Sequence, residues 1–144
     1  MKFLIQRVKQ AQVDIAKETV GTIGQGLLVL IGIGKDDSRE TAERLVKKTL
    51  SLRIFADADG KTNLSLRDVG GSLLLVSQFT LYADCRKGNR PTFNNARNAE
   101  LAKSLYEYTI ELCKKENVPV ETGRFGADMA VSLLNDGPFT LLLE

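Results

Sequence analysis

Leu27-Leu28-Val29-Leu30-Ile31-Gly32-Ile33 is the longest apolar run in the chain, and it decides the fold class. It follows the turn-forming residues 24–26, Gly-Gln-Gly. A continuous apolar run of this length after a turn is typical of a strand that is covered on both faces. The run is too short to cross a bilayer, which needs about 20 apolar residues. We therefore expect residues 27–33 to form a central strand of a buried sheet.

Further segments of alternating or continuous apolar residues predict more strands along the chain. They are residues 3–15, expected as an edge or half-buried strand, and residues 19–23, 72–79, 120–122, 127–134 and 139–143. The last two are separated by residues 135–138, Asn-Asp-Gly-Pro. The simplest interpretation of residues 135–138 is an ordinary hairpin turn between the two strands.

Two segments repeat apolar residues at helical spacing. The first covers about residues 38–53, and Asp37 is its candidate N-cap. The second begins at Asn94 or Asn95, either of which can cap it, and ends near Glu116, shortly before a proline. Strands and helices in this order, joined by short connections, predict an α+β fold that favours antiparallel pairing.

The size and composition of the chain limit its organisation and its chemistry. It has 144 residues, of which 43% are hydrophobic and 26% charged, so we expect a single domain over residues 1–144. The absence of histidine excludes an imidazole base and every histidine-ligated metal site. Cys85 and Cys113 form no metal-binding motif, so we expect no metal. A polar start and the lack of a long apolar run predict a soluble cytoplasmic protein with no membrane partner.

Polar residues end the buried strand at 72–79 and form the first candidate site. Ser77, Gln78 and Thr80 bring two hydroxyls and an amide to the point where this strand enters a loop. Strand ends that lead into loops often carry functional residues. The alternative is that Ser77 and Thr80 only bond to neighbouring backbone groups.

The loop that follows contains the clearest basic cluster outside the helices, Arg86, Lys87 and Arg90. The net charge of +2 is too balanced to indicate a nucleic-acid-binding protein by itself. A few well-placed phosphate contacts are nevertheless enough to bind a nucleic acid. The alternative is an ordinary solvated loop.

The turn at residues 135–140 is the second candidate site. Gly137 permits backbone conformations that other residues avoid, and the bond before Pro138 is one at which a cis peptide is tolerated. A cis bond here would hold neighbouring carbonyl groups facing one cavity. The alternative, as above, is a hairpin turn without a functional role.

Taken together, the motifs resemble those of one family, the D-aminoacyl-tRNA deacylases. Ser77-Gln78-Phe79-Thr80 and Asn135-x-Gly137-Pro138-x-Thr140 are similar to the two signature motifs of the family. Residues 5–8 (Ile-Gln-Arg-Val), 87–91 (Lys-Gly-x-Arg-Pro) and 123–129 (Gly-x-Phe-Gly-Ala-x-Met) resemble further family segments. The segments follow one another in the family's order and span nearly the whole chain.

The resemblance implies an enzyme that hydrolyses the ester between a D-amino acid and the terminal adenosine of tRNA, without a cofactor. Many members also remove glycine from mischarged tRNA. The implied fold has antiparallel β-sheets that form a barrel-like core with two main helices. The implied assembly is a homodimer whose sites lie near the subunit interface, with the Gly-Pro turn of one subunit entering the site of the other. No DNA partner is implied.

The resemblance also assigns roles to individual residues. The expected catalytic residues are Ser77, Gln78, Phe79 and Thr80, and the expected substrate-binding residues are Arg7, Phe125, Met129, Asn135, Gly137, Pro138 and Thr140. Core packing explains Phe125 and Met129 equally well, and the alternative for Arg7 is a solvated strand residue. On their charge, Arg86, Lys87 and Arg90 are the expected tRNA-binding residues. In this interpretation the carbonyl oxygens of a cis Gly-Pro turn block an L side chain, and glycine passes because it has none. Clashing main-chain atoms discriminate by exclusion rather than by affinity.

Two mechanisms fit a chain that lacks histidine. In the first, Thr80 attacks the ester, although no base is evident beside it. In the second, which the family favours, the 2′-hydroxyl of the terminal adenosine helps to activate water, while N–H groups near Phe79 and Thr80 stabilise the oxyanion. Three other functions remain open: a noncatalytic tRNA-binding or sensing module of the same fold, a related deacylase with a trans Gly-Pro turn that admits certain L-amino acids, and a structural oligomerisation protein.

Overall fold

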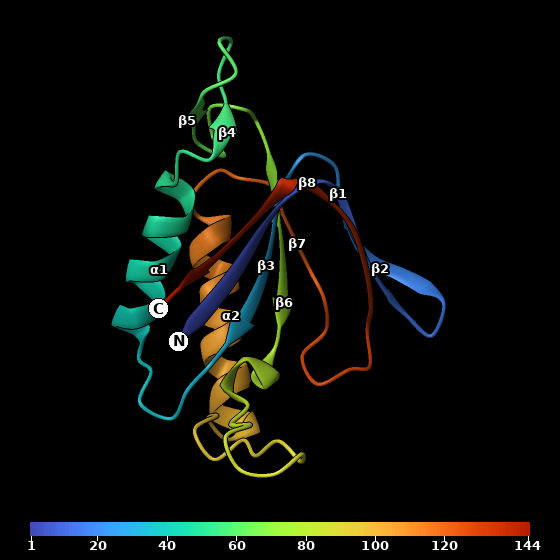
Figure 1. Cartoon of the computed structure of the whole chain (residues 1–144), viewed down its shortest axis with the longest axis vertical. Coiled ribbons are helices and arrows are strands. Elements are labelled where there is room, and N and C mark those ends of the chain that lie inside the picture. Colours follow the sequence, from blue (N-terminus) through green and yellow to red (C-terminus); the bar gives the residue numbers. More distant parts are fainter.

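The computed structural model describes residues 1–144 and contains a six-stranded sheet, a two-stranded hairpin, two α-helices and a short 3₁₀ helix. In chain order the elements are β1 (Lys2–Ile15), β2 (Glu18–Ile23), β3 (Gly26–Gly32), α1 (Arg39–Ser51), β4 (Phe55–Ala56), β5 (Thr62–Leu64), β6 (Ser72–Ser77), η1 (Phe79–Tyr82), α2 (Ala99–Lys114), β7 (Val120–Thr122) and β8 (Ala130–Leu143). Figure 1 shows the two α-helices on one side of the sheet and the β4–β5 hairpin at its upper end. None of the helices has the length and apolar character needed to span a membrane.

Strand β1 organises the sheet because it is hydrogen-bonded along both edges. It pairs antiparallel with β3 through residues 2–8, with β2 through residues 11–15, and with β8 along nearly its whole length. The strand expected at 3–15 therefore forms and is half-buried, but it lies inside the sheet and not at an edge. Because β2 also contacts β6 and β7, the sheet curls into a barrel-like core.

Strand β6 departs from the antiparallel pairing that the sequence favours. It is parallel to both β3 and β7. In the chain, α1 lies between β3 and β6, and α2 lies between β6 and β7. Each connection therefore returns the chain to the end of the sheet where the previous strand began, so that the next strand runs in the same direction. The α+β class, the barrel-like core and the two main helices are confirmed. The sheet is mixed because helical crossovers, and not hairpins, connect these three strands.

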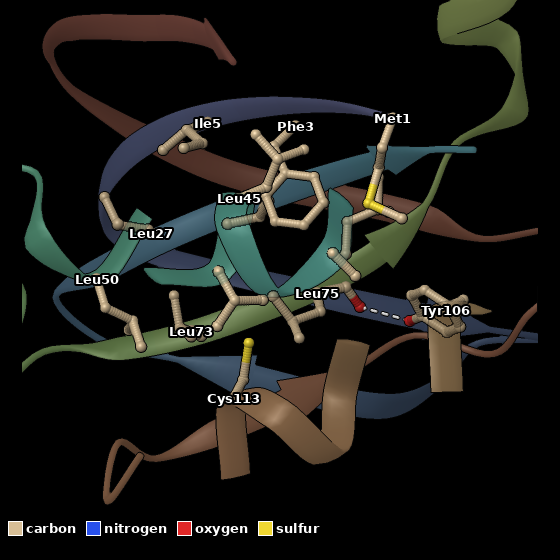
Figure 2. Packing of buried hydrophobic residues seen from close by; sticks show 14 of the residues in the cluster. Met1, Phe3, Ile5, Leu27, Leu45, Leu50, Leu73, Leu75, Tyr106 and Cys113 are labelled. Carbon is tan, nitrogen blue, oxygen red and sulfur yellow. Dashed lines mark hydrogen bonds between the residues drawn. The ribbon is translucent and has the colours of Figure 1, made fainter. Parts of the chain in front are cut away.

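The main core lies between the sheet and the two helices. Strand β3 pairs with β1 and β6 and is buried along almost its whole length, which confirms the central strand expected at 27–33. On α2, the hydroxyl of Tyr106 donates to the carbonyl oxygen of Leu75 on β6 at 2.8 Å, and Figure 2 shows this bond among buried side chains of the core. Burial raises the pKa of Tyr106, so its phenol remains a neutral donor. The bond ties α2 to the strand that leads to Ser77.

Helix α1 forms where it is expected, but its N-cap is Ser38 and not Asp37. The side chain of Ser38 accepts a hydrogen bond from the N–H of Thr41. Asp37 is engaged elsewhere, because its carboxylate accepts hydrogen bonds from the N–H of Gly34 at 2.6 Å and from the hydroxyl of Tyr82 at 3.2 Å. A carboxylate committed to a loop and to a distant tyrosine cannot also cap the helix.

Helix α2 begins later than the sequence predicts. Its N-cap is Asn98, whose side chain accepts from a backbone N–H of the first turn, and neither Asn94 nor Asn95 takes this role. The reason lies in the preceding residues. The N–H of Arg97 donates to the carbonyl oxygen of Ile33 at 2.9 Å, just beyond the end of β3. The chain is held beside β3 until residue 97 and becomes helical only after it.

The two strands expected at 127–134 and 139–143 are one strand, and the expected hairpin between them is wrong. Both halves of β8 pair with β1 and not with each other. Asn135 and Thr140 pair with residues of β1 on either side of Arg7, so residues 136–139 bulge out of the strand opposite Arg7 alone. The Gly-Pro motif therefore lies in a bulge of an edge strand.

Candidate active site

The segment expected to be catalytic lies at the carboxyl end of β6. Strands β3 and β6 are parallel and end together, with Ser77 paired to Ile31. The N–H of Gln78 donates to the carbonyl oxygen of Ile31 at 2.8 Å, after which the chain turns into η1. Ser77 and Gln78 are half-buried, whereas Phe79 and Thr80 are exposed. The two half-buried residues are held by the sheet, and the two exposed ones begin a helical turn.

Close packing of η1 against β3 depends on Gly32. A Cβ atom at this position would lie 2.9 Å from the Cβ of Leu81 and 3.2 Å from the carbonyl oxygen of Gln78. Carbon atoms do not approach this closely without displacing one another. The glycine in the middle of the apolar run therefore lets the end of β3 support the candidate catalytic segment from behind.

A cavity of about 510 Å³ lies beside this segment, and we call it the Ser77 cavity. Its walls come from the ends of β3 and β6, the start of α2, the segment between β7 and β8, and the beginning of β8. Most of the lining side chains are apolar, as in pockets that hold small organic ligands. The expected site residues on its wall are Ser77, Gln78, Phe79, Phe125 and Met129.

Two aromatic rings on the wall are held by aromatic neighbours. The ring of Phe79 meets that of Phe93 edge-on, with ring centroids 4.9 Å apart. The ring of Phe125 is tilted against that of Tyr106, with centroids 5.9 Å apart. Pairs at these separations are favourable beyond their buried area. The cavity therefore offers fixed aromatic faces to a planar ligand.

Thr80 does not line the Ser77 cavity. Its exposed hydroxyl accepts a hydrogen bond from the side-chain amide of Gln78. The N–H groups of Phe79 and Thr80 open η1 and so have no acceptor within it, and no loop carbonyl or side chain accepts from them. The Ser77 hydroxyl also makes no hydrogen bond within the chain, so three donors beside the cavity are available to a ligand.

Arg97 is the only charged residue on the wall of the Ser77 cavity, and it was not among the residues expected from the sequence. It belongs to neither signature motif and precedes the helix cap by one position, where periodicity is uninformative. No carboxylate or lysine lines the cavity. No group of three or more His, Cys, Asp or Glu side chains anywhere in the chain is arranged to hold a metal ion.

The Gly-Pro turn does not line the Ser77 cavity. The Gly137–Pro138 peptide bond is cis, and the φ angle of Gly137 is 137°, a conformation that L-residues rarely adopt. Arg7 holds the turn: its Nε donates to the carbonyl oxygen of Asp136 at 3.0 Å, and its guanidinium carbon lies 4.8 Å from the centre of the Phe139 ring. The turn is fixed from the β1 side.

The base of the turn is closed by Asn135 and Thr140. The Asn135 side-chain oxygen accepts from the N–H of Phe139 at 2.8 Å, and its amide nitrogen donates to the Thr140 hydroxyl at 3.1 Å. Both expected residues therefore lie in the turn and shape it. Neither lines the Ser77 cavity.

The two signature motifs lie at opposite ends of the sheet within one chain. Arg7 also donates to the carbonyl oxygen of Ile54, which precedes β4 directly. In Figure 1, β4 is at the top of the molecule and the yellow-green segment that follows β6 is at the bottom. Within a single chain, the Gly-Pro turn therefore lies far from the Ser77 cavity.

The expected basic cluster is only partly free. Arg86 forms a two-point ion pair with Asp84, with Nη2 2.6 Å from one carboxylate oxygen, and these hydrogen bonds lower the pKa of Asp84 to about 2. Lys87 and Arg90 are exposed and form no ion pair. Arg86 also lines a larger, polar cavity of about 820 Å³ on the Tyr82 side of η1. The number of basic residues in the sequence does not indicate that Asp84 neutralises the charge of Arg86.

Comparison with known proteins gives full-length matches. The family model described as D-Tyr-tRNA(Tyr) deacylase matches residues 4–144. A D-aminoacyl-tRNA deacylase of Thermosipho africanus is 56% identical over 144 residues, which cover 100% of this chain and 97% of the relative. A D-aminoacyl-tRNA deacylase of Shewanella loihica is 55% identical over 141 residues, which cover 98% of this chain and 97% of the relative.

Solved structures agree in fold. The structure titled c-Myc DNA Unwinding Element Binding Protein superposes with a TM-score of 0.95 at 41% identity, covering 100% of this chain and 98% of the other. A probable eukaryotic D-amino acid tRNA deacylase superposes with a TM-score of 0.86 at 18% identity, covering 99% and 97%, a likeness of fold alone. The family model and the full-length relatives together show that the chain belongs to the D-Tyr-tRNA(Tyr) deacylase family.

Proposed function

We propose that this protein hydrolyses the ester bond of D-aminoacyl-tRNA and releases tRNA and the free D-amino acid. The Ser77 cavity carries the proposal. It is an aromatic-walled space lined by Phe79, whose N–H is unused, and by Ser77, whose hydroxyl is free; the unused N–H of Thr80 follows in η1. An ester carbonyl placed beside those donors would have its developing negative charge stabilised. The names of the full-length relatives support the same reaction.

The terminal adenosine of tRNA is the part of the substrate that the cavity suits best. A planar base fits between apolar walls and can stack on Phe125, with Met129 beside it. Ser77 and Gln78 then hold the ribose and the ester at the end of β6. Positioning alone supplies a large part of the rate enhancement for an ester, which is already an activated substrate.

Water is activated by the substrate in this proposal. No carboxylate or lysine lines the cavity, and the chain contains no histidine. A 2′-hydroxyl lies next to the ester bond in any aminoacyl-adenosine, so it can guide a water molecule to the carbonyl carbon. Thr80 lies outside the cavity with its hydroxyl bonded to Gln78, which favours a structural or water-orienting role over a nucleophilic one.

The Gly137–Pro138 turn excludes L-amino acids in this proposal, while glycine, which lacks a side chain, is accepted. A filter of this kind needs main-chain oxygens that do not give way. Arg7 supports such stiffness through the carbonyl oxygens of Asp136 and Ile54 and through the ring of Phe139. Because the turn is remote from its own cavity, a second copy of the chain must bring it there.

The surface of β8 supports a homodimer. β8 pairs with β1 on one edge only, so its other edge has unpaired backbone groups. Leu133, Leu134 and Leu142 on this strand are 37%, 51% and 48% exposed. Exposed leucines gathered on one strand are typical of a surface that another protein covers. A second copy covering β8 would bring the bulge of each subunit towards its partner.

The loop beyond η1 is the proposed contact with the tRNA backbone. Lys87 and Arg90 supply free charges, whereas Arg86 must share its charge with Asp84. The net charge of +2 suits a protein that makes a few phosphate contacts and takes its specificity from the acceptor end. A DNA partner is not part of the proposal.

Matched pairs of D- and L-aminoacyl-tRNA test the proposal directly. We expect hydrolysis of the D ester and of glycyl-tRNA, and survival of the L ester under the same conditions, measured by loss of labelled amino acid from tRNA. Binding without hydrolysis of any ester would identify a noncatalytic tRNA-binding module instead. Equal hydrolysis of both enantiomers would contradict a turn that excludes one of them.

Mixed dimers test whether the turn serves the partner's cavity. One subunit carries Ser77→Ala and Gln78→Ala, and the other carries Arg7→Met. If the turn acts across the interface, each mixed dimer contains one site built only from unchanged parts, so about half of the wild-type activity per dimer should return. Differently tagged subunits allow the mixed dimer to be purified. A mixed dimer as inactive as its two parents, or a chain that is monomeric in solution, would contradict this arrangement.

A further inference from the structure

Arg97 is held in place on the wall of the Ser77 cavity and takes no part in the proposed activation of water. Its backbone N–H donates to the carbonyl oxygen of Ile33, and its Nη1 donates to the carbonyl oxygens of Lys35, at 3.2 Å, and Asp37. All three acceptors belong to the segment that follows β3. The guanidinium is therefore preorganised, and a ligand that uses it need not order the side chain first.

Two nitrogens of this guanidinium, Nε and Nη2, have no hydrogen-bond partner in the chain. The Nε of Arg97 is buried and is the only buried side-chain nitrogen or oxygen in the protein without a hydrogen bond. Because Nε is closed to solvent, a ligand cannot reach it. Nη2 is not one of the buried unpartnered atoms, so it is the free donor that is available to a ligand in the Ser77 cavity. Arg97 also borders a second cavity of about 150 Å³, which is too small for a nucleobase, whereas the Ser77 cavity has room for one.

We propose that Arg97 binds the terminal adenosine of tRNA by donating from its guanidinium to a ring nitrogen of adenine. This inference rests on the proposed function. The ring nitrogens of adenine are hydrogen-bond acceptors that lie in the plane of the base. A base that faces Phe125 and Met129 brings its edge to the remaining wall of the cavity, where Arg97 supplies the charged donor.

A neutral acceptor fits this wall better than a phosphate group does. Apart from Arg97, the lining contributes a serine, a glutamine and otherwise apolar or small residues. A phosphodiester would have to give up its hydration for a single cation on an apolar wall, which is unfavourable. A ring nitrogen loses little hydration and can accept a hydrogen bond from the free Nη2 of Arg97. Arg97 is thus a specificity-determining residue for adenine.

Calorimetry tests the inference. It measures how tightly adenosine and adenosine 5′-monophosphate bind to the wild type, to Arg97→Lys and to Arg97→Met. Lysine keeps the charge and can reach the carbonyl oxygens of Lys35 and Asp37, but it has no second terminal nitrogen to replace Nη2. We expect both variants to bind both ligands about tenfold more weakly, by equal factors. With D-aminoacyl-tRNA, KM should rise by more than kcat falls.

Substrate analogues identify the acceptor atom. Three tRNAs are compared, which end in 1-deaza-, 3-deaza- or 7-deazaadenosine and so each lack one ring nitrogen. The wild type should hydrolyse the tRNA that lacks the acceptor atom with a kcat/KM about tenfold lower than for normal tRNA. Arg97→Lys should hydrolyse that same tRNA and normal tRNA with equal kcat/KM. The matched control is Arg53→Lys, because Arg53 bonds to Asn63 on the β4–β5 hairpin and does not line the cavity. This control should bind adenosine as the wild type does, and thermal unfolding should show that both lysine variants remain folded.

The outcomes separate this inference from the proposed function. If the wild type hydrolyses D-aminoacyl-tRNA but Arg97→Lys and Arg97→Met bind adenosine as tightly, the inference is overturned and the function stands. A loss confined to adenosine 5′-monophosphate overturns it as well, because the contact would then be to phosphate. If the wild type neither binds adenosine nor hydrolyses the ester, both fall.

Discussion

Removal of the 2′-hydroxyl from the terminal adenosine should slow single-turnover hydrolysis of D-aminoacyl-tRNA by about 10²–10⁴-fold, the usual contribution of general acid–base groups. Thr80→Ala should slow it by less than about tenfold. The physical reason is the composition of the Ser77 cavity, whose wall has no carboxylate or lysine, and the position of Thr80 outside it. Excess enzyme and a rapid quench isolate the chemical step from product release.

Two controls make this result interpretable. The deoxy ester is less reactive by itself, so each catalysed rate must be divided by the rate of the same ester without enzyme. Thr80→Ser keeps a hydroxyl that can accept from Gln78 and should behave like the wild type. Loss of several orders of magnitude in Thr80→Ala, together with normal hydrolysis of the deoxy ester, would show instead that Thr80 is the nucleophile.

Arg7→Met, on β1 opposite the turn, should have a large effect on both rate and selectivity. We expect kcat/KM for the D ester to fall by about 10²-fold, since displacements of about 1 Å in a site have this effect. We also expect the ratio of L to D hydrolysis to rise by about tenfold. The Arg7 side chain is only 14% exposed and donates to the carbonyl oxygens of Asp136 and Ile54. Methionine fills the space next to Phe139 but donates to neither carbonyl.

The stability of the same variant gives an independent measure. Hydrogen bonds to charged groups contribute about 1.5–3 kcal/mol each, so loss of both bonds from Arg7 should lower the free energy of unfolding in urea by about 3–6 kcal/mol. Lys9→Met is the matched control, because Lys9 also faces Asp136, at 3.9 Å, but its side chain is 65% exposed. Exposed ion pairs contribute about 0–1 kcal/mol. An unchanged ratio of L to D hydrolysis in Arg7→Met would contradict the role given to the turn.

Local periodicity was sufficient to place most elements. The run at 27–33 gave a buried central strand, and the helical spacing at 38–53 gave α1 within two residues at each end. These patterns reflect which face of an element is buried, and burial acts on every residue of the element. The α+β class followed from their order.

The errors arose where distant residues compete for local groups. Asp37 looks like a helix cap in sequence, but Gly34 and Tyr82 take its carboxylate. Residues 135–138 look like a hairpin turn, but both flanking segments pair with β1, which lies at the other end of the chain. No local pattern encodes a partner that far away, so neither outcome follows from propensity.

The candidate site was only partly accessible from sequence. Motif resemblance found Ser77, Gln78, Phe79, Phe125 and Met129, and the fold places all five on one cavity. It also found Gly137 and Pro138, but it could not indicate that a single chain keeps them away from that cavity. Arg97 was not predicted because its significance depends on a free donor on the wall of a cavity, an arrangement that only the three-dimensional structure creates.

Pairing of β1 with β8 has a consequence for how the molecule is made. Of the strands described, β1 leaves the ribosome first and β8 last, so one edge of β1 stays open until β8 has emerged. Contacts between residues so far apart in sequence form slowly. Until β8 arrives, nascent chains expose a strand edge on which neighbouring chains can aggregate. Early folding steps can assemble β1–β3 and α1, but the barrel is completed only after β8 has emerged.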